Sequence, residues 1–395
     1  MSHAPDPFAP ARLGPLTLRN RFIKAATFEG VMRRGAVSDE LVEFHRAVAR
    51  GGVGMTTVAY CAVSPGGRVN RNTLVMSPEI VGDLERLTGA VHDEGAAVAA
   101  QIGHAGLVAD VRSNRTSTLA PSTRFSAPAM SRVHGASPED LDRVTADFVS
   151  ATKVVADAGF DAIEIHLGHN YLLSSFMSPN LNHRTDDLGG SIENRMRFPR
   201  RVVAAVREAA PDTMAVTAKF NMADGVDGGL WLEESLPMAQ LLEADGHLDA
   251  LQLTGGSSLL NGMYFFRGDV PMKEFIATQP ALVGLGLRVM GRRIFPKYPY
   301  EEGFFLPFAR QFRDALSMPL VLLGGINRRD TVEGAMAEGF EFVAMARALL
   351  REPDLVNRMQ ADADHAGLCV HCNKCLPTIY SGTRCVLTTP APAPA

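Results

Sequence analysis

The sequence lacks the features that mark several large classes of protein. Its 395 residues carry a formal net charge of −4 and a pI near 6.3, without the basic excess of general nucleic-acid or anionic-membrane binders. No basic, apolar leader opens the chain, and its most apolar windows, such as 281–290, are too short to span a bilayer. Only five cysteines occur, four of them between Cys369 and Cys385, whereas a secreted disulfide framework would spread them along the chain. These absences favour a cytoplasmic protein with no nucleic-acid and no membrane partner.

What the sequence does contain is a regular alternation of short apolar segments with amphipathic ones. Hydrophobic residues make up 46% of the chain, which is typical of a folded globular protein. We predict strands over roughly 21–27, 55–60, 97–103, 162–166, 215–220, 250–254, 320–324 and 342–346. We predict helices between and after them near 38–50, 78–94, 138–158, 191–210, 233–245, 302–317, 329–338 and 353–361. Eight β–α pairs in strict alternation indicate a closed parallel (β/α)8 barrel.

The barrel is predicted over residues 1–361, followed by a cysteine-containing C-terminal extension over 362–395 whose Pro/Ala-rich end (387–395) should be disordered. An open doubly wound sheet is the structural alternative, but no GxGxxG dinucleotide fingerprint follows any strand. Two long loops, 105–136 and 255–300, are expected on the catalytic face, with simple surface insertion as the alternative. The second loop carries Tyr264, Phe265, Phe266, Arg267, Arg292 and Arg293.

One predicted strand end carries three residues suited to chemistry. The apolar run at 162–165 leads into His166, with His169 and Tyr171 close behind, and barrel enzymes keep their active sites at the C-terminal ends of the strands. A metal site is an alternative for the two histidines, but no third ligand lies nearby and Tyr171 suits hydrogen bonding better. The group therefore indicates a catalytic or binding function.

Other predicted strand ends indicate an anion site. Gly324 and Gly325 leave backbone N–H groups open, Arg347 adds a fixed charge, and loops seven and eight form the usual phosphate cradle of β/α barrels. A phosphorylated ligand is therefore predicted. Lys219, in strand five, is either a point charge for an anionic group or a Schiff-base nucleophile. Gln101, in strand three, could pair with a cofactor ring through its donor and acceptor.

Taken in order, these segments resemble the old yellow enzyme family of FMN-dependent oxidoreductases, also described as NADH:flavin oxidoreductases. The similarity covers nearly the whole predicted barrel and includes residues 161–198, within which NHRTDDLGGSIENR (182–195) is specific by itself. The other similar segments are LGPLTLRNRF (13–22), GGVGMTTVAY (51–60), QIGHAG (101–106), TAKFNMADG (217–225), LQLTGG (251–256), LLGGIN (322–327) and MARALLREPDL (345–355).

The resemblance implies that FMN binds at the barrel mouth. Gln101 would hydrogen-bond the pyrimidine part of the flavin, and Lys219 would place a positive charge beside N1 and the C2 oxygen. The backbone after strand one would line the redox-active edge, and the end of strand two would support the ring. With the phosphate cradle, the further implied contacts are Ala25, Ala26, Thr27, Tyr60, Gly324, Gly325, Ala346 and Arg347.

The resemblance also implies a reaction. His166 and His169 would hold the substrate's carbonyl oxygen and Tyr171 would donate the proton, while NADH or NADPH and then an enone or enoyl substrate use the flavin in a ping-pong cycle. The function implied is reduction of the C=C bond of an α,β-unsaturated carbonyl compound. The alternatives are an iron–sulfur oxidoreductase similar to dienoyl-CoA reductase, a phosphate-binding Schiff-base lyase using Lys219, and a flavin-binding protein without turnover.

Three positions depart from the family pattern. Phe28 stands where relatives carry a Cys or Thr that tunes the flavin, so a different flavin potential is expected. Leu107 replaces an arginine that commonly follows His-Ala-Gly. Asn170 stands where glycine usually precedes the tyrosine, which leaves the orientation of Tyr171 open.

The C-terminal cysteines form a dense cluster, Cys369-x2-Cys372-x2-Cys375-x9-Cys385. The spacing fits a four-thiolate iron–sulfur site or a structural zinc. A branch of the family carries a four-iron cluster after the barrel, with longer third and fourth spacings and a further C-terminal nucleotide-binding portion. Because the sequence stops about ten residues past Cys385, a cluster here would lack its usual electron route. We therefore expect no metal, with a 4Fe-4S cluster and zinc as the alternatives.

Overall fold

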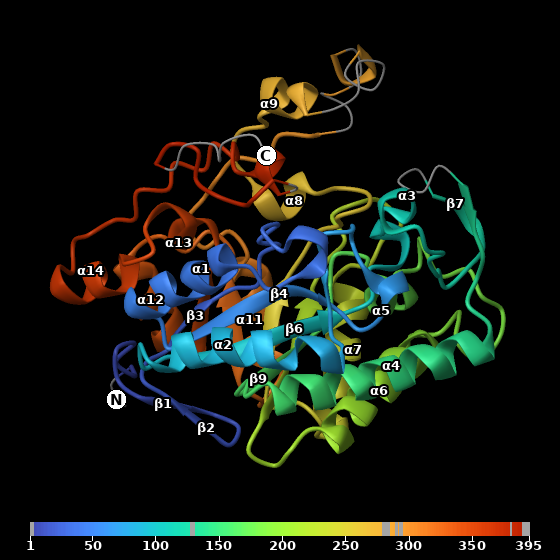
Figure 1. The fold of residues 1–395 in the computed structure, drawn as a ribbon, viewed down its shortest axis with the longest axis horizontal. Coiled ribbons are helices and arrows are strands. Elements are labelled where there is room, and N and C mark those ends of the chain that lie inside the picture. Colours follow the sequence, from blue (N-terminus) through green and yellow to red (C-terminus); the bar gives the residue numbers. More distant parts are fainter. Residues whose placement is uncertain are drawn as a thin grey trace.

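The computed structural model describes residues 4–126, 131–278, 285–288, 291, 295–379 and 381–388. Eight parallel strands close into a barrel, because β3 pairs with β13 on one side and with β4 on the other. This confirms the predicted (β/α)8 architecture (Figure 1). In spatial order the strands are β3 (Phe22–Lys24), β13 (Phe342–Met345), β12 (Leu320–Leu323), β11 (Ala250–Thr254), β10 (Ala215–Asn221), β9 (Ala162–Leu167), β6 (Ala97–Gly103) and β4 (Met55–Ala62).

Near the N-terminal ends of the strands, the barrel interior is filled mainly by small apolar side chains. Alanines from five barrel strands belong to this cluster, and an N-terminal hairpin of β1 (Ala11–Leu13) and β2 (Leu16–Leu18) packs on it. Small residues let the strand backbones converge, and the hairpin excludes water from this end. The opposite end of the barrel is left free for polar side chains. The five alanines are Ala99, Ala162, Ala215, Ala250 and Ala344.

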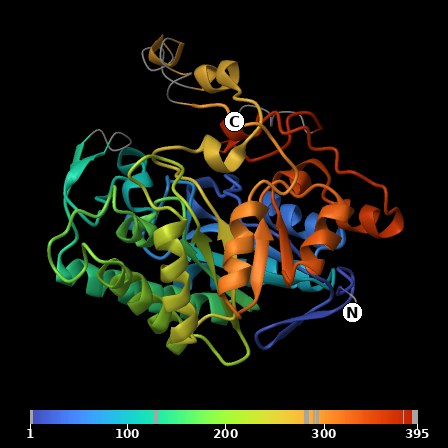
Figure 2. The same ribbon diagram turned by 180° about the vertical axis from the view of Figure 1, so that it is seen from behind.

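Most of the helices that surround the barrel begin within two residues of the predicted positions, but those predicted from 78 and 302 begin later, at Val81 and Leu306. Ser38, Ser137 and Ser191 cap α1, α4 and α6 by accepting a backbone N–H in the first turn. Figure 2 shows the outer helices from behind. Their bounds are α1 (Asp39–Arg50), α2 (Val81–His92), α4 (Pro138–Asp157), α6 (Ile192–Ala209), α7 (Leu232–Asp245), α11 (Leu306–Ala315), α12 (Arg329–Ala337), α13 (Arg347–Arg351) and α14 (Leu355–Ala361).

The long loops lie beyond the C-terminal ends of the strands (Figure 1). The third loop holds α3 (Val111–Asn114) and a hairpin of β7 (Arg124–Ser126) and β8 (Ser131–Val133), and the sixth holds α8 (Met263–Phe266) and α9 (Met272–Ala277). The remaining elements are α5 (Leu172–Met177), β5 (Leu74–Val75) and short 3-10 turns at Arg33–Gly35, Pro65–Gly67, Pro78–Ile80, Gly106–Val108 and Leu376–Thr378.

The first barrel strand ends at Lys24, not at Thr27 as predicted, because Ala25–Thr27 leave the sheet to line a cavity. Arg292, Arg293 and nearly all of the tail predicted to be disordered lie outside the described residues. Within the part of the chain that the structure describes, no helix is long and apolar enough to cross a membrane.

Candidate active site

A cavity of about 520 Å³ opens at the C-terminal end of the barrel. Its size lies within the range of small-molecule and cofactor sites. All of the residues predicted as catalytic or cofactor-binding line this one cavity, although they come from seven barrel strands and the loops that follow them. They are Ala25, Ala26, Thr27, Tyr60, Gln101, His166, His169, Tyr171, Lys219, Gly324, Gly325, Ala346 and Arg347.

The two histidines and Tyr171 form a contiguous aromatic group on one wall. His166 stacks on Tyr171 with ring centroids 4.3 Å apart, and His169 meets His166 edge-on at 5.2 Å. Tyr60 approaches Tyr171 edge-on at 5.2 Å, so the group is fixed from the side of β4. The sequence prediction that these side chains share one site agrees with this geometry.

Both histidines are neutral at physiological pH. Burial lowers the pKa of His169 to about 3, with the positive charge of Lys219 adding to the effect. Burial also lowers the pKa of His166 well below its usual value, helped by His169 and Lys219. The Gly168 N–H donates to His166 Nδ1 at 3.2 Å, so the ring proton of the neutral imidazole lies on Nε2. His166 is therefore built to donate one hydrogen bond from Nε2.

Glu164, which contacts two of the predicted site residues, was missed by the sequence analysis. This buried carboxylate on β9 accepts a hydrogen bond from Gln101 Nε2 at 2.7 Å and lies 3.2 Å from Lys219 Nζ. Glu164 thus connects the two side chains predicted to meet the pyrimidine part of the flavin. The contact with this carboxylate favours the point-charge role of Lys219 over the Schiff-base role. An acidic residue inside an apolar strand was the available signal.

A second buried ion pair holds the cavity wall after β3. Lys24 Nζ lies 2.6 Å from Glu29 Oε1 and donates to Thr27 Oγ1 at 3.0 Å, while Thr27 Oγ1 donates to Glu29 at 3.1 Å. The second Glu29 oxygen accepts the Ala59 N–H at 3.1 Å. Burial lowers the pKa of Lys24 and raises the pKa of Glu29, so each charge depends on the other. This pair anchors the loop that carries Ala25–Thr27.

The predicted phosphate cradle has the backbone that an anion site needs. Gly324 and Gly325 have φ of 121° and 73°, and a Cβ on either would lie 2.7 Å or less from a phenylalanine ring carbon. Only glycine fits such a close, left-handed path, and it leaves backbone N–H groups uncovered. The Arg347 side chain also lines the cavity and donates to the Arg267 carbonyl at 3.3 Å and to Asn373 Oδ1. Glycine backbone, arginine and the Gln101–Glu164–Lys219 group together fit an anionic flavin nucleotide.

Comparison with known proteins identifies the family. The sequence pattern of the NADH:flavin oxidoreductase / NADH oxidase family matches residues 6–252. The chain belongs to this family. It is 70% identical over 389 residues to the 4,4'-dithiodibutanoate disulfide reductase of Rhodococcus erythropolis, covering 98% of this chain and 96% of that protein.

Two further similar proteins are longer than this chain. A metal reductase of Desulforamulus reducens (strain ATCC BAA-1160 / DSM 100696 / MI-1) is 32% identical over 381 residues, which are 94% of this chain and 52% of that protein. A 2-naphthoyl-CoA reductase, solved in complex with 2-naphthoyl-CoA, matches with a TM-score of 0.82 at 21% identity, over 97% of this chain and 56% of that one. The chain thus spans about half the length of these two proteins.

The structure shows the environment of each of the three positions that depart from the family pattern. Leu107 is buried against Ala120, Val133 and Leu181, an apolar site in which an arginine would lose its hydration. Phe28 lines the main cavity. Asn170 has a φ of 59°, a left-handed conformation that asparagine tolerates in place of glycine.

The four C-terminal cysteines line a second cavity beside the first. All four are free thiols, and Arg347, His371 and Cys375 line both cavities. Burial raises the pKa of Cys375 to about 11 and that of Cys369 as well, although Arg347 lowers both. Among the described residues, no group of three or more His, Cys, Asp or Glu is arranged to hold a metal ion. The extension therefore completes the wall of the main cavity and places its thiols next to it.

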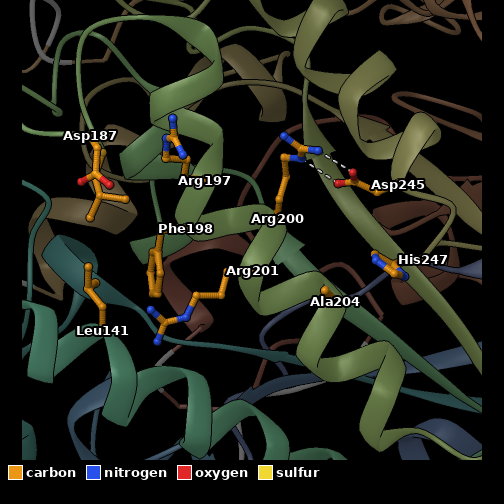
Figure 3. A pocket seen from close by; sticks show the side chains of 10 residues that line it. Leu141, Asp187, Arg197, Phe198, Arg200, Arg201, Ala204, Asp245 and His247 are labelled. Atoms are coloured by element: carbon orange, nitrogen blue, oxygen red, sulfur yellow. Dashed lines mark hydrogen bonds and ion pairs between the residues drawn. The ribbon is translucent and has the colours of Figure 1, made fainter.

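A third cavity, of about 450 Å³, lies on the outside of the barrel between α4 and α6, away from every predicted site residue (Figure 3). It is lined by three arginines, and two of them are paired with carboxylates. Arg200 makes two hydrogen bonds to Asp245, at 2.7 and 2.5 Å, and Arg201 lies 2.6 Å from Asp142. Its geometry is that of a structural surface depression.

Proposed function

We propose that this chain binds FMN at the barrel mouth and uses NADH or NADPH to reduce a small organic disulfide, with breakage of the S–S bond. The main support for this proposal is that the predicted flavin-binding and catalytic residues all line one cavity in a chain 70% identical to a disulfide reductase. Two electrons from the nicotinamide and two protons convert R–S–S–R into two thiols. Bound FMN would supply the store for those two electrons.

The protein's own residues would bind the acceptor and supply protons. Neutral His166 donates from Nε2 without carrying charge, and His169 Nε2 lies 3.1 Å from Thr254 Oγ1. Tyr171, stacked on His166, is the proposed proton donor to the departing atom. Aromatic side chains of the sixth loop cover the cavity, with Phe265 at 4.6 Å from the His169 ring. They would exclude water from the reacting atoms and favour an apolar acceptor.

The test is an anaerobic assay of FMN-loaded protein with NADH or NADPH and 4,4'-dithiodibutanoate. We expect nicotinamide oxidation with release of two thiols per nicotinamide, and thiol release at least tenfold slower when Tyr171 is changed to Phe. A colourless protein that refuses FMN in a titration would contradict the proposal, as would FMN-loaded protein that releases no thiol.

Reduction of the C=C bond of an α,β-unsaturated carbonyl compound is the second candidate. It is favoured by the two neutral histidines beside Tyr171, since paired donors on a carbonyl oxygen stabilise the developing enolate. A cyclic enone and an enoyl thioester in the same assay separate the candidates. The acceptor with the higher kcat/KM identifies the reaction for which the cavity is built.

The four thiols that line the small second cavity are the residues that would hold a metal group, but among the described residues they are not arranged around one. Buried thiols next to Arg347 would lose their protons on binding iron or zinc, and Cys375 and His371 lie between the two cavities. Iron, acid-labile sulfide and zinc analysis of anaerobically purified protein distinguishes a cluster, a structural zinc and free thiols.

A further inference from the structure

The turn between β9 and α5 has an uncommon backbone. His169 and Asn170 have φ of 58° and 59°, so two successive residues other than glycine are left-handed. Such residues are disfavoured for L-amino acids and persist only where the surroundings hold them. This turn carries His169 and leads directly into Tyr171, the residue that precedes α5.

A single buried carboxylate, Asp224, is connected to both ends of α5. Its Oδ1 accepts Asn170 Nδ2 at 3.0 Å, just before the helix, and its Oδ2 accepts Ser178 Oγ at 2.6 Å, just after it. Asp224 has no exposed surface. It therefore clamps the short helix from the loop that follows β10.

The same carboxylate is itself held by its own loop. Asp224 Oδ1 also accepts Asn221 Nδ2 at 2.8 Å, and Oδ2 accepts the Leu230 N–H at 2.9 Å. Asn221 Oδ1 in turn accepts the His169 N–H at 3.3 Å. The left-handed turn is thus connected to the end of β10 through two side-chain paths.

We propose that Asp224 is a positioning residue, which acts through Asn170 and Asn221 to keep the His169–Asn170 turn left-handed and so aims His169 and Tyr171 into the cavity. The inference rests on the roles proposed for these two residues. It explains how this chain can use asparagine at the position where the family resemblance implies glycine. Glycine would take the conformation freely, whereas asparagine takes it with a tether.

Two substitutions at one position test the tether. Asn170→Ala and Asn170→Gly both remove the amide, but only alanine resists the left-handed conformation. We expect Asn170→Ala to lower kcat about five- to thirtyfold, the population change that the conformational preference of one residue produces. Asn170→Gly should retain most of kcat. Asp224→Asn should lower kcat as Asn170→Ala does, and the double variant should be no worse than the more severe single one, because both remove the same contact.

A readout independent of turnover is the fluorine NMR signal of Tyr171 in FMN-loaded protein labelled with 3-fluorotyrosine. The chain has six tyrosines, and Tyr171→Phe identifies the signal. We expect it to shift in Asn170→Ala and in Asp224→Asn and to remain in place in Asn170→Gly. Equal behaviour of the alanine and glycine variants would overturn the proposal. So would a lower unfolding midpoint with an unchanged signal and kcat, which is the result of a purely structural role.

The experiment also separates this inference from the proposed function. If Tyr171→Phe kept full activity with every acceptor, the proposed role of Tyr171 would fail, while the fluorine signal would still decide whether Asp224 holds the turn. Should Asp224→Asn fail to fold, the alanine and glycine pair at position 170 decides alone.

Discussion

Breaking the buried pair Lys24–Glu29 from one side should cost far more stability than breaking an exposed pair of the same length. The two charges lie 2.6 Å apart, with side chains about 1% exposed. At an effective dielectric constant near 20, charges at this separation attract by about 6 kcal/mol. Breaking such a pair from one side leaves an unpaired buried charge, so Glu29→Gln should lower the free energy of unfolding by about 3–5 kcal/mol.

The chain offers a matched control. Arg201 and Asp142 are also 2.6 Å apart, but their side chains are 44% and 71% exposed. Asp142→Asn should therefore cost about 0–1 kcal/mol. The assay is urea unfolding followed by circular dichroism, with the double variant Lys24→Met/Glu29→Gln as a second comparison. Removing both charges leaves no unpaired ion, so the double variant should be more stable than Glu29→Gln alone.

The result that would refute this reasoning is Glu29→Gln no more destabilised than Asp142→Asn. The reasoning would also be refuted if the double variant lost as much free energy of unfolding as Lys24→Met and Glu29→Gln lose together. The coupling of the two charges would then be absent. Because Glu29 also accepts from Thr27 and from the Ala59 N–H, FMN binding should weaken along with stability in Glu29→Gln and stay unchanged in Asp142→Asn.

Two further predictions concern the site, and a third concerns the buried histidines. Tyr171→Phe should slow acceptor reduction by tenfold or more while reduction of the flavin by NAD(P)H stays nearly intact, because proton donation typically contributes about 10²–10⁴-fold; stopped-flow measurement of the two half-reactions checks this, and equal losses in both would count against it. Gly324→Ala should weaken FMN binding at least tenfold in a fluorescence titration, since its Cβ would lie 2.7 Å from the Phe305 ring, whereas Gly82→Ala on open helix surface should bind normally. Burial lowers the pKa of His45, His104, His166 and His169, to about 4 for His104 and about 3 for His169. Below pH 6.5 the unfolded chain therefore binds more protons than the folded one, and the free energy of unfolding should fall by up to about 1.4 kcal/mol per pH unit for each histidine. Urea midpoints that stay level between pH 7 and 5.5 would contradict this.

The sequence alone was sufficient for the barrel and for most of the cavity wall. Strand and helix periodicity is local, so each of the eight β–α pairs can be recognised from its own residues. Parallel strands in a barrel direct their C-terminal ends to one face, so residues such as Gln101, Lys219 and Arg347 could be expected to meet without knowing any distance.

Only the tertiary structure showed how the side chains beneath that wall are paired. Glu164 contacts Gln101 and Lys219, which are 63 and 55 positions away, and these contacts depend on the register between β6, β9 and β10. The left-handed turn at His169 and Asn170 likewise depends on Asp224, in a different loop. Sequence patterns report which face a residue lies on, whereas the pairing of buried polar groups is decided by packing between segments far apart in the chain.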